Sequence, residues 1–247
     1  MRLKCITCDA LTRSVYLCAA LSPHIVDVEL LPRGLHNHPD DLRSRLQARI
    51  DAADGQLYDA VVLAYGLCGK ATSGLKASTT RLVIPRAHDC ITLFLGSRQR
   101  YQTEFSEYPG TYWYSQDYIE RDDGSGTALS MGSGSDEQLQ SQYQDFVEKY
   151  GKDNADYLMQ VMGAWQQHYQ RAVYIDLEIG DGQAVEAKAQ AEATRRGWSF
   201  ERLKGDLALV RRLINGEWGL EPGSDFLVLQ PGQSAEIALN EDILTCA

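Results

Sequence analysis

The stretch YDAVVLAYGLCG, residues 58–69, carries the clearest fold signal in the sequence. Residues 60–65 are all apolar and do not alternate with polar residues, which is typical of a strand that is covered on both of its faces. Two glycines and a cysteine follow at once, and they indicate a sharp turn where the strand ends. We therefore expect this stretch to be a central strand of a parallel sheet with helices on both sides.

Strand and helix signals alternate on either side of this stretch. The periodicity predicts strands at residues 2–8, 24–32 and 81–87, and helices at residues 9–23, 38–53 and 88–105. Pro39 suits the start of the second helix and Asp89 suits the cap of the third. Repeated strand–helix–strand units imply an α/β fold whose parallel strands are joined by right-handed crossovers.

The alternation stops between about residues 106 and 135 and then resumes. YPGTYWYSQDYIE is aromatic and turn-rich, and the Gly/Ser-rich segment after it predicts an exposed loop. Residues 136–172 have a helical pattern that divides near Gly151. Strands are predicted again at residues 172–178, 199–205 and 225–232, with helices at residues 183–197 and 206–218.

This pattern divides the chain into three parts. Residues 1–108 form an N-terminal α/β lobe, residues 109–172 an aromatic, loop-rich and helical segment, and residues 173–247 a C-terminal α/β portion. We expect two α/β lobes with a cleft at the carboxyl ends of the strands. The alternative is that the C-terminal portion forms one domain with the N-terminal lobe.

Composition narrows the range of functions. The chain has 247 residues and a net charge of −10, which argues against binding to the phosphates of nucleic acid. It contains no run of eighteen apolar residues and begins without a secretion signal, so we expect a cytoplasmic protein without a membrane span. Six cysteines are too few for a disulfide scaffold, and in a reducing compartment such cysteines are more often metal ligands or reactive thiols.

Four residues that can bind a metal follow the predicted strands. Cys8 follows the first strand, Cys68 the third, and His88 and Cys90 the fourth. Because parallel strands end at one edge of a sheet, these side chains can meet there. Three cysteines and a histidine suit zinc or an iron–sulfur cluster. Cys90 is also expected at a helix N-terminus, which favours the thiolate.

Other interpretations of these residues remain open. Cys68 and Cys90 can be small core residues, since free cysteine is among the most buried residue types. Gly66 and Gly69 can let the backbone approach a ligand closely, and Arg86 and Arg98 can receive a carboxylate or phosphate, although we favour pairing of these arginines with nearby acids. A metal-free protein that binds a small anion is therefore an alternative.

Five segments together resemble the uncharacterised family called domain of unknown function 1638. They are LPRGLHNHPDDLRSRLQ (31–47), YDAVVLAYGLCG (58–69), RLVIPRAHDCITLFLGSRQRY (81–101), PGTYWYS (109–115) and YGKDNADYLM (150–159). Members of this family are often associated with corrinoid-dependent methyl-transfer systems. The resemblance therefore implies a role in methyl-group and one-carbon metabolism, with a corrinoid methyltransferase protein or a small molecule as partner and a possible contact to the corrinoid.

The association also suggests a chemistry for the metal. Methylcobalamin:thiol methyltransferases activate a thiol with zinc held by a His-x-Cys pair and a further cysteine, and His88 and Cys90 match that pair. Cys68 lies upstream rather than downstream, so the similarity is one of chemistry. The alternatives are a non-catalytic accessory or carrier protein for such a methyltransferase, and an iron–sulfur protein.

Overall fold

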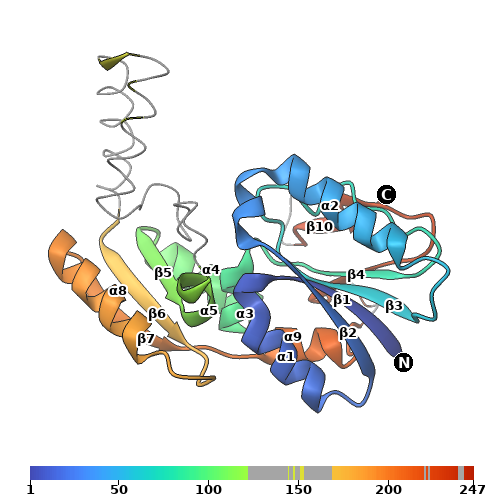
Figure 1. Cartoon of the computed structure of the whole chain (residues 1–247), viewed down its shortest axis with the longest axis horizontal. Coiled ribbons are helices and arrows are strands. Elements are labelled where there is room, and N and C mark those ends of the chain that lie inside the picture. Colours follow the sequence, from blue (N-terminus) through green and yellow to red (C-terminus); the bar gives the residue numbers. More distant parts are fainter. Residues whose placement is uncertain are drawn as a thin grey trace. The chain divides into compact units, whose positions relative to one another are not determined.

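The computed structural model describes residues 1–121, 144, 147, 151–152, 169–219, 221, 223–238 and 242–247. The chain forms two compact units, each built from separate segments (Figure 1). The first unit comprises Met1–Glu104, Leu177–Gly180 and Lys204–Ala247, and the second comprises Phe105–Asp176 and Asp181–Leu203. The C-terminal α/β portion is thus divided between the units. The predicted Gly/Ser loop lies outside the described residues, as do most of the helical residues predicted at 136–172.

A five-stranded sheet is the centre of the first unit, in the order β2-β1-β3-β4-β8. The strands are β1 (Arg2–Cys8), β2 (Ile25–Leu31), β3 (Ala60–Ala64), β4 (Leu82–Pro85) and β8 (Phe226–Leu229). The first four are parallel and β8 is antiparallel to β4, so the predicted α/β fold with a parallel sheet is confirmed. Every residue of β3 is buried, as its apolar run predicts. A small antiparallel pair, β9 (Ala235–Ile237) and β10 (Leu244–Cys246), completes the strands of this unit.

Helices cover both faces of this sheet (Figure 1). On one face, α1 (Thr12–Leu21) packs against α9 (Ala208–Ile214). On the other face, α2 (Pro39–Ala52) buries an apolar stripe of Leu42, Leu46 and Ile50 in a core cluster shared with β1 and β3. The remaining helical segments of the unit are η1 (Asp9–Leu11), η2 (Arg33–Asn37), α3 (Cys90–Leu95) and the part of α4 (Arg98–Glu107) up to Glu104.

The order of the strands contains a switch point at the junction of β1 and β3. The chain leaves β1 through α1 to β2 on one side, and then returns through α2 to β3 on the other side of β1. Neighbouring strands whose connections leave in opposite directions open a space beyond their carboxyl ends, where α/β proteins bind their ligands. In this chain that space lies beyond the ends of β1 and β3.

The segment 88–105 is not the single helix that we predicted. Asp89 caps α3 as expected, by accepting hydrogen bonds from the backbone N–H groups of Ile91 (3.0 Å) and Thr92 (3.3 Å). The helix then ends at Gly96, whose φ of 69° is left-handed. A side chain is also excluded there, because a Cβ at Gly96 would lie 2.6 Å from the Asp206 backbone and side chain.

The second unit contains the three-stranded sheet β5-β6-β7. Its described elements are β5 (Thr111–Ser115), α5 (Gln116–Glu120), β6 (Arg171–Asp176), α8 (Gln183–Arg196) and β7 (Ser199–Lys204). The expected break in the pattern between about residues 106 and 135 does not hold for TYWYS, which forms a fully buried strand parallel to β6. Tyr112 and Tyr114 pack against Tyr174 and Ala189 in a core cluster of this unit. Aromatic residues favour strands, and the turn residues Pro109 and Gly110 only precede this one.

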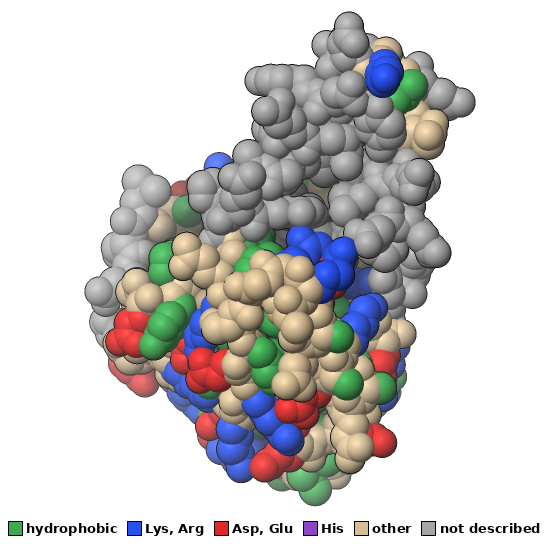
Figure 2. Space-filling model, turned by 90° about the vertical axis from the view of Figure 1, so that its left-hand side faces the viewer, with side chains coloured by type: hydrophobic (Ala, Val, Ile, Leu, Met, Phe, Trp, Pro, Cys, Tyr) green, Lys and Arg blue, Asp and Glu red, His purple; other side chains and the backbone are tan. Residues whose placement is uncertain are grey.

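Acidic and basic side chains are interspersed on the face drawn in Figure 2, and neither sign covers it. Several are paired. In the second unit, Arg195 lies 2.9 Å from Glu192, and Arg202 binds Asp176. Among the described helices, none is long and apolar enough to cross a membrane.

Candidate functional site

Three of the four predicted ligands gather at the carboxyl edge of the first unit's sheet. Cys8 is the last residue of β1, Cys68 lies in the turn after β3, and Cys90 is the first residue of α3. All three are partly buried and free. Burial raises the pKa of the Cys90 thiol well above its usual value, and the neighbouring thiols of Cys68 and Cys8 raise that pKa further. Three thiols from separate segments therefore lie within electrostatic range of one another.

The loop after β3 is bonded directly to the loop after β4. The backbone N–H of Leu67 donates to the carbonyl of Ala87 (2.7 Å), and that of Cys68 donates to the carbonyl of His88 (3.1 Å). Gly66 permits this approach, because a Cβ there would lie 2.5 Å from the Cα of Asp89. Gly66 was predicted to let the backbone approach a ligand closely, and its close neighbour in the structure is the loop after β4. These hydrogen bonds hold the loop that contains Cys68 against the loop that leads to Cys90.

The turn that holds Cys68 has an unusual backbone. Cys68, Gly69 and Lys70 have φ values of 45°, 64° and 79°, so three consecutive residues are left-handed. For a residue with a side chain this conformation costs about 1–2 kcal/mol. Only Gly69 adopts it without that cost. Such conformations are concentrated at functional sites, where the surrounding structure enforces them.

Tyr65 places a hydroxyl group beside the thiols. Only 3% of the residue is exposed, and its hydroxyl has no hydrogen-bond partner among the described residues. Burial raises the pKa of Tyr65, and the thiols of Cys8 and Cys68 raise it further, so the phenol is close to both. A buried hydroxyl without a partner costs about 1–3 kcal/mol. The site therefore contains, next to two of the three thiols, a polar group without a partner among the described residues.

Two charged residues complete the surroundings of Cys8. The Cys8 thiol donates a long hydrogen bond to Oδ1 of Asp9 (4.0 Å), and the same oxygen accepts one from the backbone N–H of Arg33 (2.8 Å). Arg33 is only 3% exposed. Burial raises the pKa of Cys8, whereas the nearby Arg33 guanidinium lowers it. Sequence analysis missed Arg33, because the burial of an arginine within a turn-rich segment leaves no pattern in the sequence.

Burial raises the pKa of all three thiols, which favours their protonated form. Burial, followed by Asp89, raises the pKa of Cys68 to about 12. Cys90 stands at a helix N-terminus, which was expected to favour its thiolate, but its pKa is raised. The burial of Cys90, with the Asp89 carboxylate next in importance, outweighs the helix end.

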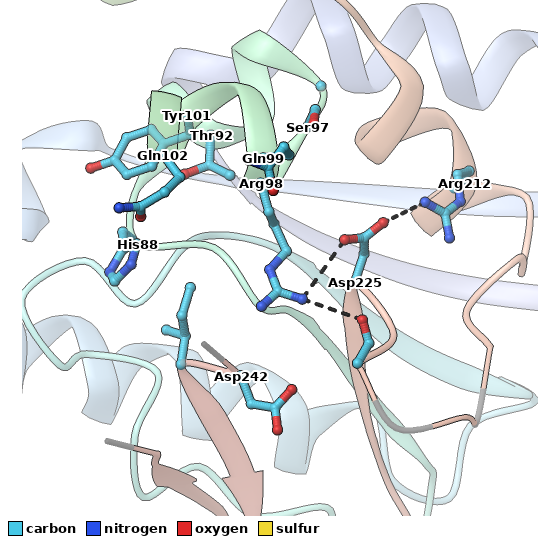
Figure 3. A pocket seen from close by; sticks show the side chains of 13 residues that line it. His88, Thr92, Ser97, Arg98, Gln99, Tyr101, Gln102, Arg212, Asp225 and Asp242 are labelled. Carbon is cyan, nitrogen blue, oxygen red and sulfur yellow. Dashed lines mark hydrogen bonds and ion pairs between the residues drawn. The ribbon is translucent and has the colours of Figure 1, made fainter. Parts of the chain in front are cut away.

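The fourth predicted ligand, His88, does not lie with the three thiols but lines another part of the unit. Its imidazole is exposed and stacks on the ring of Tyr101, with the centroids 5.7 Å apart and an interplanar angle of 27°. It lines a polar pocket of about 670 Å³, and none of the described residues lining that pocket is a cysteine (Figure 3). Within the part of the chain that the structure describes, no group of three or more His, Cys, Asp or Glu side chains is already arranged to hold a metal ion.

The two arginines predicted to meet an anion lie near this pocket. Arg86 forms an ion pair with Asp242 (2.6 Å), whose side chain lines it. Arg98 lines the pocket itself, 3.9 Å from Oδ1 of Asp225 (Figure 3). The structure thus separates the predicted residues into a thiol site, which holds the cysteines and Gly66 and Gly69, and a polar pocket.

Comparison with known proteins gives a family but no activity. A family model described as "Protein of unknown function (DUF1638)" matches residues 30–214, which is most of the chain. The chain belongs to this family. The match includes Cys68, His88 and Cys90, and the whole segment between β3 and α4. No curated protein and no solved structure matches the chain.

Proposed function

We propose that this family member is a metal-binding protein whose ligands are the thiols of Cys8, Cys68 and Cys90, and that the metal is zinc or an iron–sulfur cluster. The observation that carries the proposal is the convergence of three thiols from separate segments near the Tyr65 hydroxyl, which has no hydrogen-bond partner in the part of the chain that the structure describes. All six cysteines are free, which supports a cytoplasmic, reducing environment.

The set of donors fits these metals. Thiolates select zinc and iron–sulfur clusters over hard cations such as magnesium or calcium. The thiols lie at the β1/β3 switch point, and proteins of this topology bind their ligands at such a point. The buried cation of Arg33 would compensate the negative charge that appears when the thiols lose their protons. Because burial raises the pKa of the thiols, metal binding must release protons.

Two features would hold the thiols in place for a metal. The hydrogen bond from Cys68 to the His88 carbonyl fixes one loop against the other, and the Asp89 cap fixes the start of α3 beside Cys90. The Tyr65 hydroxyl can donate to a metal-bound thiolate, and a donor to the sulfur tunes the properties of such a site.

We further propose that the site serves corrinoid-linked methyl-group metabolism, the role that the family resemblance implies. A zinc ion with three protein ligands and an open fourth position binds and deprotonates a thiol or a water molecule. His88, which lies outside the thiol cluster, is then not a required ligand. The competing proposal is a carrier or accessory protein that holds the metal without turnover.

Metal analysis of protein purified without air tests the proposal. We expect close to one zinc ion, or the iron and sulfide of one cluster, per chain in the wild type. Single Cys8→Ala, Cys68→Ala and Cys90→Ala variants should lose it. Matched controls are Cys18→Ala in the α1 core and Cys246→Ala at the exposed C-terminal end, and both should retain it.

The spectrum and an activity assay separate the alternatives. An iron–sulfur protein is coloured and bleaches on reduction, whereas a zinc protein is colourless. Methyl transfer from a methylated corrinoid protein to a thiol that depends on the metal would favour an enzyme over a carrier. A wild-type protein free of metal, or metal retained by all three cysteine variants, would contradict the proposal.

A further inference from the structure

The outer side of α1 in the first unit is apolar and exposed. Among the described residues, eight large apolar side chains are exposed, and five of these belong to α1 or to the starts of β1 and β2 beside it. They are Met1 (43%), Tyr16 (50%), Leu17 (38%), Leu21 (77%) and Ile25 (63%). The backbone N–H of Ile25 donates to the Met1 carbonyl (3.1 Å), and Leu21 ends α1 four residues before Ile25. We call these five residues the α1 face.

The composition of α1 indicates that this face is covered by another surface. The inner side of the helix buries Val15 and Cys18, and α1 packs against α9 and the sheet. Its single charged residue is Arg13, and it has no acidic residue. A helix at the surface of a soluble protein normally presents a polar side to water, whereas a helix that is apolar all round is normally buried. The exposed apolar side of α1 is therefore typical of an interface.

The strand beside this face has a free edge. β2 is the outermost strand of the five-stranded sheet, and all seven of its residues pair with β1 without a bulge. Because the N–H of Ile25 points to β1, the alternation along a strand directs the N–H and C=O groups of Val26, Val28 and Leu30 away from β1. No other strand in the described part of the chain pairs with them. A regular edge strand without proline or lysine is a template for pairing with another strand.

Charge favours a second copy of this chain as the occupant. A net charge of −10 makes two copies repel each other, so association is easiest where carboxylates are absent or paired. α1 has no carboxylate, and the two acids of β2 are paired within their own chain, Asp27 with Arg2 (3.0 Å) and Glu29 with Lys4 (2.7 Å). A membrane fits less well, because helices that lie on anionic lipid are rich in lysine and arginine.

The area of the α1 face also suits a dimer. With about 200 Å² for each fully exposed residue, the five exposed fractions correspond to roughly 500 Å² on one copy. Two copies packed face to face would bury roughly 1,000 Å² there, which is about the lower limit for a specific interface. Pairing of the β2 edges adds to this area. A two-fold axis allows both contacts at once, because the β2 edges then pair antiparallel and the two α1 helices lie on the same side of the joined sheet.

We infer that two copies of this chain form a symmetric dimer through the α1 face and the free edge of β2. The two β2 strands pair antiparallel about Val28, so that Val26 of each copy lies opposite Leu30 of the other. The inference goes beyond the proposed metal site and does not depend on it. The thiols lie at the carboxyl ends of β1 and β3, whereas Ile25 lies at the amino end of β2.

Sedimentation equilibrium of the full-length, metal-free protein tests the inference. At high micromolar concentration the wild type should have twice the 27.6 kDa mass of one chain. Leu21→Glu and Leu17→Glu each place an unpaired negative charge on the α1 face of both copies and should weaken association about a hundredfold or more. The matched control is Leu57→Glu, which introduces the same charge at an exposed leucine in the loop before β3 and should leave the dimer intact.

Hydrogen exchange of the wild type gives a second measurement that needs no variant to fold. The amides of Val26, Val28 and Leu30 should exchange about tenfold or more slowly where the dimer forms than at high dilution, and the Asp27 amide, which points to β1, is the internal reference. A wild type that stays monomeric overturns the inference, and so does a dimer that survives both α1 variants or is lost equally in Leu57→Glu. A dimer in which these three amides exchange as fast as at high dilution also overturns it.

Discussion

The hydroxyl of Tyr65 shows how much a single atom can indicate about a site. It is buried and close to Cys8 and Cys68, and the described residues offer it no hydrogen bond. The hydroxyl of Tyr58, seven residues earlier, has a hydrogen-bond partner, because it donates to Oδ2 of Asp27 at 3.0 Å. Replacing Tyr65 therefore tests the effect of the unsatisfied hydroxyl, and replacing Tyr58 serves as the control.

Tyr65→Phe should stabilise the metal-free protein by about 1 kcal/mol, because it removes an unsatisfied buried hydroxyl. Tyr58→Phe should destabilise it by about 1 kcal/mol, because it removes a hydrogen bond to a carboxylate. Urea unfolding of both variants without metal measures the difference. A loss of stability in Tyr65→Phe as large as that in Tyr58→Phe would mean that the Tyr65 hydroxyl is already satisfied.

Asp27, near the amino end of the outer strand β2, gives a predicted pH dependence of stability. Its pKa lies below the usual 3.8 because Arg2, and after it Tyr58, donate hydrogen bonds to the carboxylate. A lowered folded pKa adds stability above the unfolded pKa, and this stability is lost as the pH falls through the folded value. Asp27→Asn should therefore cost less than about 1 kcal/mol at pH 7, since the pair is largely exposed. Unfolding curves should show that difference shrinking in acid, and a constant difference at every pH would contradict this assignment.

The cysteines could be predicted as a group, whereas their surroundings could not. Cys8, Cys68 and Cys90 each follow a recognisable strand, and the ends of parallel strands meet by topology. The positions of Arg33 and Tyr65 depend on packing that links distant segments, which no local pattern encodes. The ring direction of His88 is also set by tertiary contact, through its stacking on Tyr101.

At the scale of elements, the contact between the β3 and β4 loops is the feature on which the thiol site depends. Gly66 allows it, because any side chain there would meet the backbone of Asp89. Gly66→Ala should separate the loops and lower metal retention strongly, with a stability loss of about 1–3 kcal/mol. Metal content per folded chain measures the effect.

The matched control for Gly66→Ala is Gly55→Ala. Gly55 has a φ of 71° and nothing within 4 Å of a new Cβ, so this change introduces backbone strain without a clash. It should lower stability by about 1 kcal/mol and leave metal content unchanged. Equal loss of metal in both variants would show that general destabilisation, and not the loop contact, is responsible.

Helices and strands were predicted well where the hydrophobic pattern alone determines them. The long apolar or periodic segments β1, β3, α2 and α8 could be read from their patterns. The break between α3 and α4 could not, because a glycine within a helical pattern is often tolerated, and here the proximity of Asp206 decides. The strand β5 was missed because its aromatic residues were read together with the turn before it.

At the scale of the whole molecule, the first unit is assembled from three separate segments. Residues 204–247 supply β8, which pairs with β4, and α9, which packs against α1. Leu209, Val210 and Leu213 of α9 are fully or almost fully buried. The N-terminal half of the chain therefore lacks part of its own core.

A fragment of residues 1–104 should not fold cooperatively, since it exposes the face under α9 and the edge of β4. Thermal unfolding followed by circular dichroism, with dispersion in the amide NMR spectrum, checks this against the full chain. Addition of residues 204–247 as a separate peptide should restore some structure. A fragment that melts cooperatively by itself would contradict this description of the unit.

The central claim is that three sulfurs from distant parts of the chain bind one metal. X-ray absorption at the zinc edge, on full-length protein loaded with an equimolar amount of zinc, measures this most directly. The account predicts a shell of about three sulfur atoms at about 2.3 Å. A shell made only of nitrogen and oxygen at about 2.0–2.1 Å would contradict it.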